Sequence, residues 1–263
     1  MKELKLLVTF IRMALQEESA YRLNFLLHLL KAVLELAGSI GGIWVLFRNN
    51  ESLNGWTMPE TLAVLGVYLL VQSVKNLVIG PSMNLLGGMD GEIEQGTFDY
   101  TLLRPVSKQF YVSLRKWSPW SVFHMIVSLG VIVLALVSMD KAVTWGALLA
   151  FAAALAVAIG ILYSLMLFLS SMAFWYRGTY LLWIMEDLMQ AGRYPMGMYP
   201  RFVRLALTWV FPLGFIVSVP SQALVQDPPL AALLAGAGIM VALFIGASLF
   251  FTASLRKYTS ASS

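Results

Sequence analysis

The chain contains no cysteine, only two histidines and few charged residues. Without cysteine it has no disulfide, no thiolate metal site and no thiol nucleophile. The histidines, His28 and His124, lie far apart in the sequence, and neither begins an HExxH motif, so nothing indicates a zinc protease. A GxxxxGK[ST] run is absent as well, so any ATP hydrolysis must occur on another polypeptide. We therefore expect no catalytic residue, metal ion or cofactor on this chain.

Charged residues make up 12% of the 263 residues, whereas 59% are hydrophobic. The charged fraction is about half of that in a soluble domain, and the apolar residues are enough for six spans of about 20 residues. A soluble core of this size could not bury so many apolar residues. The apolar runs are continuous rather than alternating, which argues against an outer-membrane barrel. The sequence therefore predicts an all-α polytopic membrane protein, with residues 1–263 forming one domain.

Hydropathy divides the chain into six predicted spans, at about 23–47, 61–79, 117–139, 145–174, 180–190 and 230–254. Residues 2–20 precede them as an amphipathic helix with a basic polar face, which favours a position flat on the membrane surface over an extension of the first span. Between the last two spans, two short apolar pieces (202–211 and 212–224) are broken by Pro212 and Pro220. We expect a re-entrant hairpin here, with one kinked span over 203–219 as the alternative.

Lysine and arginine set the predicted orientation. With the N-terminus inside and six crossings, the inner segments hold eleven of the 18 basic residues and the outer segments five, while Lys31 and Lys75 lie within spans. The positive-inside rule then places both termini in the cytoplasm, so the net charge of +4 reports topology rather than nucleic-acid binding. Lys75 is expected to reach the headgroups. Lys31 lies four residues before Glu35, at the spacing of an ion pair, although snorkelling of Lys31 to the interface is the favoured alternative.

Two acidic residues, Glu186 and Asp187, lie in the short fifth span. Ionisable groups at membrane depth are costly and mark functional sites by default, so one interpretation is a polar site near a translocation path. The other interpretation, which we favour from the sequence, is a pair at the outer end of a short helix, salt-bridged to Arg193 or Arg201.

A polar stretch from Ser82 to about Lys116 separates the second and third spans. Within it, glycines interrupt the preceding helix, apolar residues recur at helical spacing after residue 97, and Pro105 stops the helix. The pattern predicts a short charged helix with an apolar anchor. It is either a docking element for a soluble partner or a loop helix on the membrane surface, and the residues alone leave both open.

The run GEIEQGTFDYTLLRPVS in this stretch resembles the cytoplasmic signature of the type-two class of ABC transporter permeases. The likeness is to the bacterial branch with a G-x-(L/F)-D-x-x-L-L-R-P-V-S run. Residues 193–224 resemble the penultimate region of the same branch through two Tyr-Pro pairs, a central proline break and a final proline. Together with the six-span layout, the likeness covers nearly the whole chain.

The resemblance implies an exporter permease in the bacterial inner membrane. It places an interfacial helix at 2–20, a cytoplasmic coupling helix at about Ile93 to Arg104 and re-entrant outer helices at about 199–224. Two nucleotide-binding subunits would carry ATP and Mg, and a second permease, identical or related, would complete the pathway within the membrane lipids. The implied ATPase contacts are Glu92, Ile93, Glu94, Phe98, Asp99, Leu102, Leu103 and Arg104, of which Phe98, Leu102 and Leu103 would anchor the helix. The implied re-entrant or pathway residues are Tyr194, Pro195, Tyr199, Pro200, Pro212, Phe215 and Pro220.

Two other function classes are alternatives to an exporter. An intramembrane enzyme acting on lipid would need a nucleophile or a metal site, yet the chain has no GxSxG motif and no carboxylate-rich constellation around its histidines. A membrane scaffold without transport is the other alternative. The sequence does not identify a transported substrate.

Overall fold

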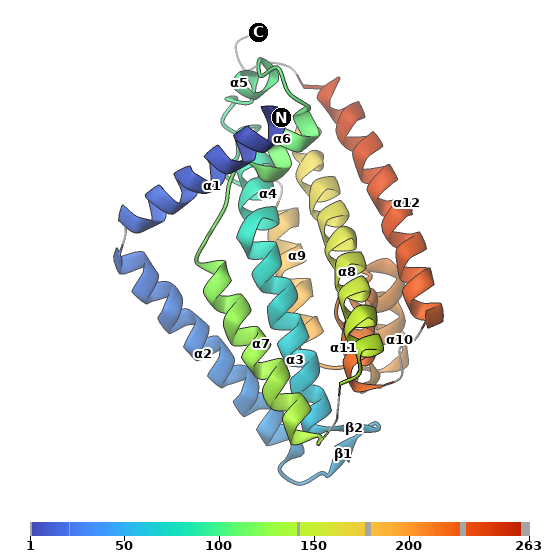
Figure 1. Cartoon of the computed structure of the whole chain (residues 1–263). Helices are drawn as coiled ribbons and strands as arrows, with labels where there is room; N and C mark the ends of the chain where they lie inside the picture. Colours follow the sequence, from blue (N-terminus) through green and yellow to red (C-terminus); the bar gives the residue numbers. More distant parts are fainter. Residues whose placement is uncertain (1, 21, 141–142, 177–179, 227–229, 259–263) are drawn as a thin grey trace.

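The computed structural model describes residues 2–20, 22–140, 143–176, 180–226 and 230–258, and these are almost entirely helical (Figure 1). The predicted class, an all-α polytopic membrane protein, is confirmed. Five described helical stretches are long and apolar enough to cross a membrane, or six if one bent helix pair counts as a span. The five are α2 (Arg22–Phe47), the run from α3 (Met58–Val74) to α4 (Gly80–Gly87), α7 (Ser121–Ser138), α8 (Trp145–Ser171) and α12 (Leu230–Leu255).

Connecting elements gather at the two ends of this bundle. The amphipathic helix α1 (Lys2–Ala20), the short helices α5 (Asp99–Leu102) and α6 (Lys108–Leu114) and the end of α12 lie at one end (Figure 1). A hairpin of β1 (Ser52–Leu53) and β2 (Trp56–Thr57) lies at the opposite end. Lys141 and Arg177, which entered the charge count above, and residues 259–263 lie outside the described residues.

The second span is longer than predicted. It was expected to end near residue 79, before Gly80 and Pro81, but the helix continues through both to Gly87. A π-helical turn, η1 (Lys75–Ile79), ends two residues before Pro81. The wider π-turn leaves room for the proline ring and needs no hydrogen bond from its missing N–H. The helix therefore changes to π-type hydrogen bonding over one turn and continues instead of stopping. The polar loop therefore begins at Gly88 rather than at Ser82.

π-helical turns also occur in the region predicted to be re-entrant. The π-turn η5 (Ala206–Val210) follows α10 (Arg201–Leu205), and the π-turn η6 (Gly214–Ser218) leads into α11 (Val219–Val225). The two arms meet at 83° around Pro212, so this proline breaks the helix as predicted. The break predicted at Pro220 is wrong, because the helix runs from η6 through this proline into α11.

The path of the chain on either side of the bent pair bears on the predicted re-entrant hairpin. In Figure 1, α8 ends at the end that carries α5 and α6, whereas α12 starts near the opposite end. The helix α9 (Leu181–Met189) and the 3-10 turns after it run between these two ends, but α9 alone is too short to be a candidate span. The bent pair lies in the half of the bundle toward the β-hairpin (Figure 1), and its geometry fits a broken span as well as a re-entrant loop, so the hairpin stays a prediction.

The helix α3 forms the centre of the core, between α7 and α8, while α12 packs on α8. In the candidate span that contains α3, 61% of the residues used to identify it are buried, against 11% in α2. Close contact depends on small residues at two positions: Gly66 lies against Ile132 of α7, and Gly160 lies against Met240 of α12. The helix α12 has the same 11% but packs along α8, whereas α2 is buried chiefly toward its C-terminal end, at Ser39, Ile43 and Phe47, and a cavity lies between α2 and α3.

The helix α1 is docked at its C-terminal end. The Glu18 carboxylate accepts hydrogen bonds from the Ser118 hydroxyl and the Trp120 backbone N–H, each 3.1 Å long, just before α7 begins. Burial raises the pKa of Glu18, against the effect of these two hydrogen bonds. Elsewhere on α1, Val8 and Leu15 are more than half exposed. This apolar surface is the part of α1 available to a membrane.

Candidate functional site

The predicted coupling helix lies in the loop of residues 88–116, which we call the coupling segment. An aromatic anchor fixes this segment to the ends of two spans. Phe98 is fully buried, and its ring makes edge contacts with Phe174 after α8 and Tyr258 after α12, at centroid distances of 5.2 and 5.3 Å. Ile93 is 3% exposed, and Leu102 packs partly buried against the same core. The anchoring roles predicted for Phe98 and Leu102 therefore match their positions.

The helix in this segment is much shorter than the predicted 93–104. The helix α5 covers only Asp99–Leu102, because the residues before it form turns. One turn places Gly96 at φ +70°, a left-handed conformation that interrupts a right-handed helix. After α5, the Lys108 ammonium donates to the Leu102 carbonyl at 2.7 Å, which satisfies one of the free carbonyls at the helix end.

A buried polar contact holds the two ends of the segment together. The Arg115 guanidinium donates to Glu92 Oε1 at 2.6 Å and to the Thr101 hydroxyl at 3.1 Å, while that hydroxyl donates to Glu92 Oε2 at 2.8 Å. The Arg115 side chain is 4% exposed and that of Glu92 is 21% exposed. Glu92, predicted as an ATPase contact, thus has both carboxylate oxygens engaged within the chain. No sequence pattern distinguished Arg115 from the other basic residues near the third span.

The outer surface of the segment consists of residues that point away from the core. Leu103 is 81% exposed and Tyr100 is 72% exposed, and the side chains of Glu94 and Arg104 are also exposed. The anchoring role predicted for Leu103 is therefore wrong, because one helical step past Leu102 turns its side chain outward. Asp99 is half-buried at the start of α5. Tyr100, which sequence reasoning missed, belongs to this outer surface.

Replacing Phe98 by Ala is expected to destabilise the fold by about 3–5 kcal/mol, since it removes a fully buried ring from between two others. Tyr100→Ala, two residues away, removes an exposed ring and is expected to change stability by less than about 0.5 kcal/mol. Thermal unfolding of the purified variants in detergent measures both. Equal losses of stability would contradict the anchor.

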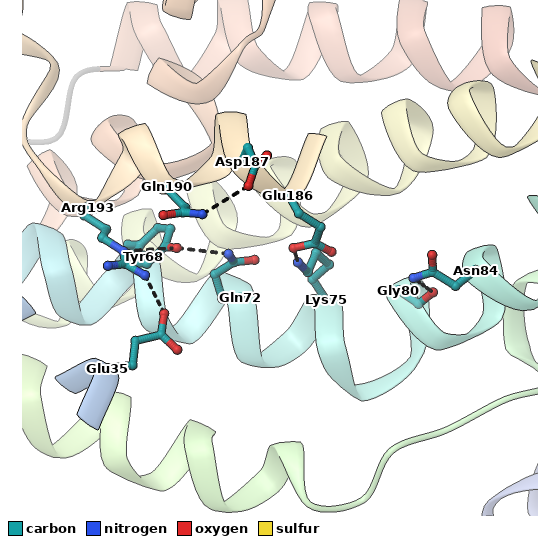
Figure 2. Close-up of polar contacts among 10 residues, drawn as sticks. All are labelled: Glu35, Tyr68, Gln72, Lys75, Gly80, Asn84, Glu186, Asp187, Gln190 and Arg193. Carbon is teal, nitrogen blue, oxygen red and sulfur yellow. Dashed lines mark hydrogen bonds and ion pairs between the residues drawn. The ribbon is translucent and has the colours of Figure 1, made fainter. Parts of the chain in front are cut away.

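Ionisable side chains meet inside the bundle, where Lys75 of η1 forms an ion pair with Glu186 of α9 (Figure 2). The Lys75 side chain is 1% exposed and that of Glu186 is 39% exposed. The predicted extension of Lys75 to the headgroups is wrong, because the π-turn directs this side chain across to α9. The predicted pairing of Glu186 with Arg193 or Arg201 is also wrong, because the Glu186 carboxylate pairs with Lys75. Asp187 instead accepts a hydrogen bond from Gln190, at 3.3 Å.

A second ion pair joins the turn after α9 to α2. Arg193 donates to Glu35 at 2.6 Å and lies over the Tyr68 ring, 5.6 Å from its centroid (Figure 2). The Tyr68 hydroxyl accepts a 3.0 Å hydrogen bond from the Gln72 amide. Glu35 therefore pairs with Arg193, and Lys31 lies more than 4.0 Å from it, so the pair suggested by the four-residue spacing is absent.

These ion pairs border a cavity of about 1080 Å³ between α2, α3, α7 and α9. Its polar lining includes charged, amide and hydroxyl side chains from all four helices and their flanking turns, among them Lys31, Glu35, Tyr68, Gln72, Asn76, Ser121, His124, Glu186 and Arg193. Leucines of α2 supply much of the apolar part. A large space with both polar and apolar walls among the spanning helices can hold a polar or amphipathic ligand.

None of the residues predicted for the re-entrant region is in the described lining of this cavity. The Tyr199 hydroxyl donates to the Ala191 carbonyl at 2.9 Å, and Tyr194 lies against Gly42 of α2. Pro195 and Pro200 immediately precede a 3-10 turn and α10. Phe215 is 6% exposed and makes an edge contact with Trp209 across the Pro212 break.

Between these residues, Gly197 packs against Trp56 of the β-hairpin, whose Asn54 amide donates to the Gly197 carbonyl at 3.3 Å. These contacts close one end of the bundle. Their role in a pathway remains a prediction. Within the part of the chain that the structure describes, no group of three or more His, Asp or Glu side chains is placed to hold a metal ion.

Comparison with known proteins bears on the whole arrangement of spans, loop segment and bent helices. The sequence model of a family described as ABC-2 family transporter protein matches residues 33–262, from α2 to the end of the chain. Searches of curated proteins and of solved structures give no significant match. Members of this family are multi-pass membrane components of ABC transporters and are not themselves catalytic. Since the match takes in every candidate span as well as the anchored loop, the chain belongs to the ABC-2 family of transporter proteins.

Proposed function

We propose that the chain is the permease subunit of a bacterial inner-membrane ABC exporter. A separate ATPase subunit binds ATP and Mg and docks on the coupling segment, and a second permease, identical or related, completes the pathway. Both termini then face the cytoplasm, together with α1 and α5. Family membership and the absence of a P-loop from the sequence support this assignment.

The observation that carries the proposal is the exposed surface of the anchored coupling segment. Tyr100, Leu103 and Arg104 project from a segment whose other side is held by Phe98 and by the Glu92–Arg115 ion pair. Tyrosine and arginine are among the residue types that dominate binding energy at protein interfaces, and the exposed leucine adds apolar area. A rigidly held element can transmit a displacement, whereas a mobile loop would absorb it.

The route from this segment to the cavity is short and continuous. The helical run from Met58 to Gly87 enters the segment directly, and the side chains of Gln72 and Asn76 on the same run line the cavity. Closure of the ATPase subunits on ATP therefore moves the segment, and the segment moves a wall of the cavity. A ligand-driven switch of this kind needs contacts that differ between the two states, and the ATPase interface supplies them.

Changing the exposed surface is expected to abolish coupling without unfolding the permease. In Leu103→Asp/Arg104→Glu, both side chains are exposed, so stability changes by less than about 1 kcal/mol. ATPase stimulation by the reconstituted permease is expected to fall by about tenfold or more, because a hot-spot arginine contributes about 2 kcal/mol and the variant reverses its charge. Arg48→Glu, an exposed arginine at the β-hairpin end, serves as the matched control. Full stimulation in the double variant, or an equal loss in the control, would remove the segment from the ATPase interface.

A further inference from the structure

We propose that the cavity between α2 and α3 binds an amphipathic anion, with the acidic group beside Lys31 and the hydrocarbon chain along the leucines of α2. The inference rests on the proposed exporter function and names the chemical class of its substrate. It follows from which of the cavity's charges are already paired inside the protein.

Both carboxylates of the cavity lining already have a cation. Glu35 pairs with Arg193 at 2.6 Å, and Glu186 pairs with Lys75, whose side chain is 1% exposed. Lys31 also lines the cavity, and its side chain is exposed. Among the described residues, no carboxylate lies within 4.0 Å of the Lys31 ammonium.

The lysine, arginine and glutamate side chains of the described lining balance in number, but Lys75 of η1 pairs with one of the two carboxylates, so Lys31 is left without a carboxylate within 4.0 Å. Lys31 is the third residue of the candidate span Leu29–Phe47, and an ammonium in a span is costly unless it meets an anion, headgroups or water. A ligand anion would lower this cost, whereas a ligand cation would find Glu35 and Glu186 occupied and would meet Lys31 as a like charge. The charge pattern thus favours an anionic ligand over a cationic one.

The surroundings of Lys31 supply the apolar half of the site. Leu27, Leu30 and Leu34 lie one helical turn or less from Lys31, all three line the cavity, and they are 56%, 55% and 63% exposed. On the facing wall, the exposed Asn76 amide and the Ser121 hydroxyl provide neutral polar partners. A single charge next to a leucine surface fits a molecule with one acidic group and one alkyl chain.

The test uses the full-length permease in phosphatidylcholine nanodiscs and two probes of equal chain length, dodecyl phosphate and dodecyltrimethylammonium. Both probes carry bromine atoms on the alkyl chain, and bromine quenches nearby tryptophan fluorescence. Trp120 lines the cavity and serves as the reporter. The variants are Lys31→Gln, Lys31→Arg, Trp120→Phe and, as a matched control, Lys5→Gln, which alters an exposed lysine on α1 outside the described cavity lining.

For the wild-type chain, we expect saturable quenching by dodecyl phosphate and only partition-like, non-saturating quenching by the cation. Lys31→Gln is expected to raise the half-saturating concentration of dodecyl phosphate about tenfold, the usual loss for a charged hydrogen bond. Lys31→Arg and Lys5→Gln should stay near the wild type. Trp120→Phe should lose most of the saturable signal.

Equal half-saturation in Lys31→Gln and Lys5→Gln would overturn the proposal, as would saturable binding of the cation with the same half-saturation as the anion. Gel filtration of each variant confirms that it is folded, and Lys31 is exposed, so its replacement leaves the core intact. The nanodiscs contain no ATPase. A negative binding result therefore refutes the ligand class alone. If binding is intact but the permease fails to stimulate the ATPase in the separate reconstitution described above, the exporter function is refuted instead.

Discussion

Glu186→Gln is expected to destabilise the permease by about 3–5 kcal/mol, because it leaves the ammonium of Lys75 buried without a carboxylate. Lys75→Met is expected to cost less, about 1 kcal/mol, since the Glu186 side chain that it leaves unpaired is 39% exposed toward the cavity. The asymmetry follows from the difference in burial between the partners. Apparent unfolding midpoints in detergent should therefore fall by about 10 °C or more for Glu186→Gln and by a few degrees for Lys75→Met.

The double variant Lys75→Met/Glu186→Leu is the control for this prediction. It removes both charges and replaces them with apolar side chains of similar size, a change that is often neutral or stabilising for a buried ion pair. Its midpoint should return close to that of the wild type. If Glu186→Gln unfolded at the wild-type temperature, Lys75 would have to reach the headgroups, as the sequence suggested, and the pairing with α9 would be disproved.

Gly87→Ala is expected to have the second large effect. A Cβ atom at this position would lie 2.3 Å from the carbonyl oxygen of Ser170 and 2.9 Å from its Cα, so the methyl group would meet backbone at the end of α8. Neither helix can relieve this contact by a side-chain rotation, and α4 must shift away from α8. We expect a destabilisation of about 3 kcal/mol, at the upper end of the usual range for overpacking, together with loss of ATPase stimulation, because Gly87 is the last residue of the helix before the coupling segment.

Gly38→Ala is the matched control. Gly38 lies within α2, and a Cβ atom there would have nothing within 4 Å. Because alanine favours a helix over glycine by up to about 1 kcal/mol, this variant should be as stable as the wild type or slightly more stable. The unfolding midpoint and the ATPase stimulation of the two variants are measured side by side. Equal values for Gly87→Ala and Gly38→Ala would contradict the close approach of α4 and α8.

The layout of the protein could be predicted from the sequence because long apolar runs have few folding options in a membrane. The spans near 23–47, 145–174 and 230–254 agree with α2, α8 and α12 to within a few residues. The anchoring position of Phe98 was also predictable, since an aromatic residue followed four residues later by Leu102 marks one face of a helical turn.

The partners of the intramembrane charges could not be predicted from sequence spacing. Glu35 was considered with Lys31, four residues away, yet its partner is Arg193, 158 positions along the chain. Likewise, Lys75 and Glu186 are 111 positions apart. Such pairs are determined by how helices cross, which local periodicity does not encode. The prediction that Leu103 anchors the helix was wrong for a different reason. A four-residue helix has too few residues for the sequence pattern to define its buried face.

The π-turns explain the remaining differences. Prolines 81 and 220 were expected to end helices, but a π-turn precedes each of them and the helices continue. Sequence rules treat a proline as a helix stop, although a wider turn upstream can accommodate its ring. The same geometry directs Lys75 toward α9, so the deviation from regular helix coincides with the ion pair at the cavity.

The helical run from Met58 to Gly87 is also longer than the hydrocarbon layer of a bilayer is thick. Its 30 residues extend for about 45 Å, whereas the hydrocarbon layer is about 30 Å thick. Even with a moderate tilt, two or more helical turns clear the acyl chains and pass through the headgroup layer. This excess length gives α5 and α6, which follow the run, room to lie outside the acyl chains, as the proposed docking of an ATPase subunit requires.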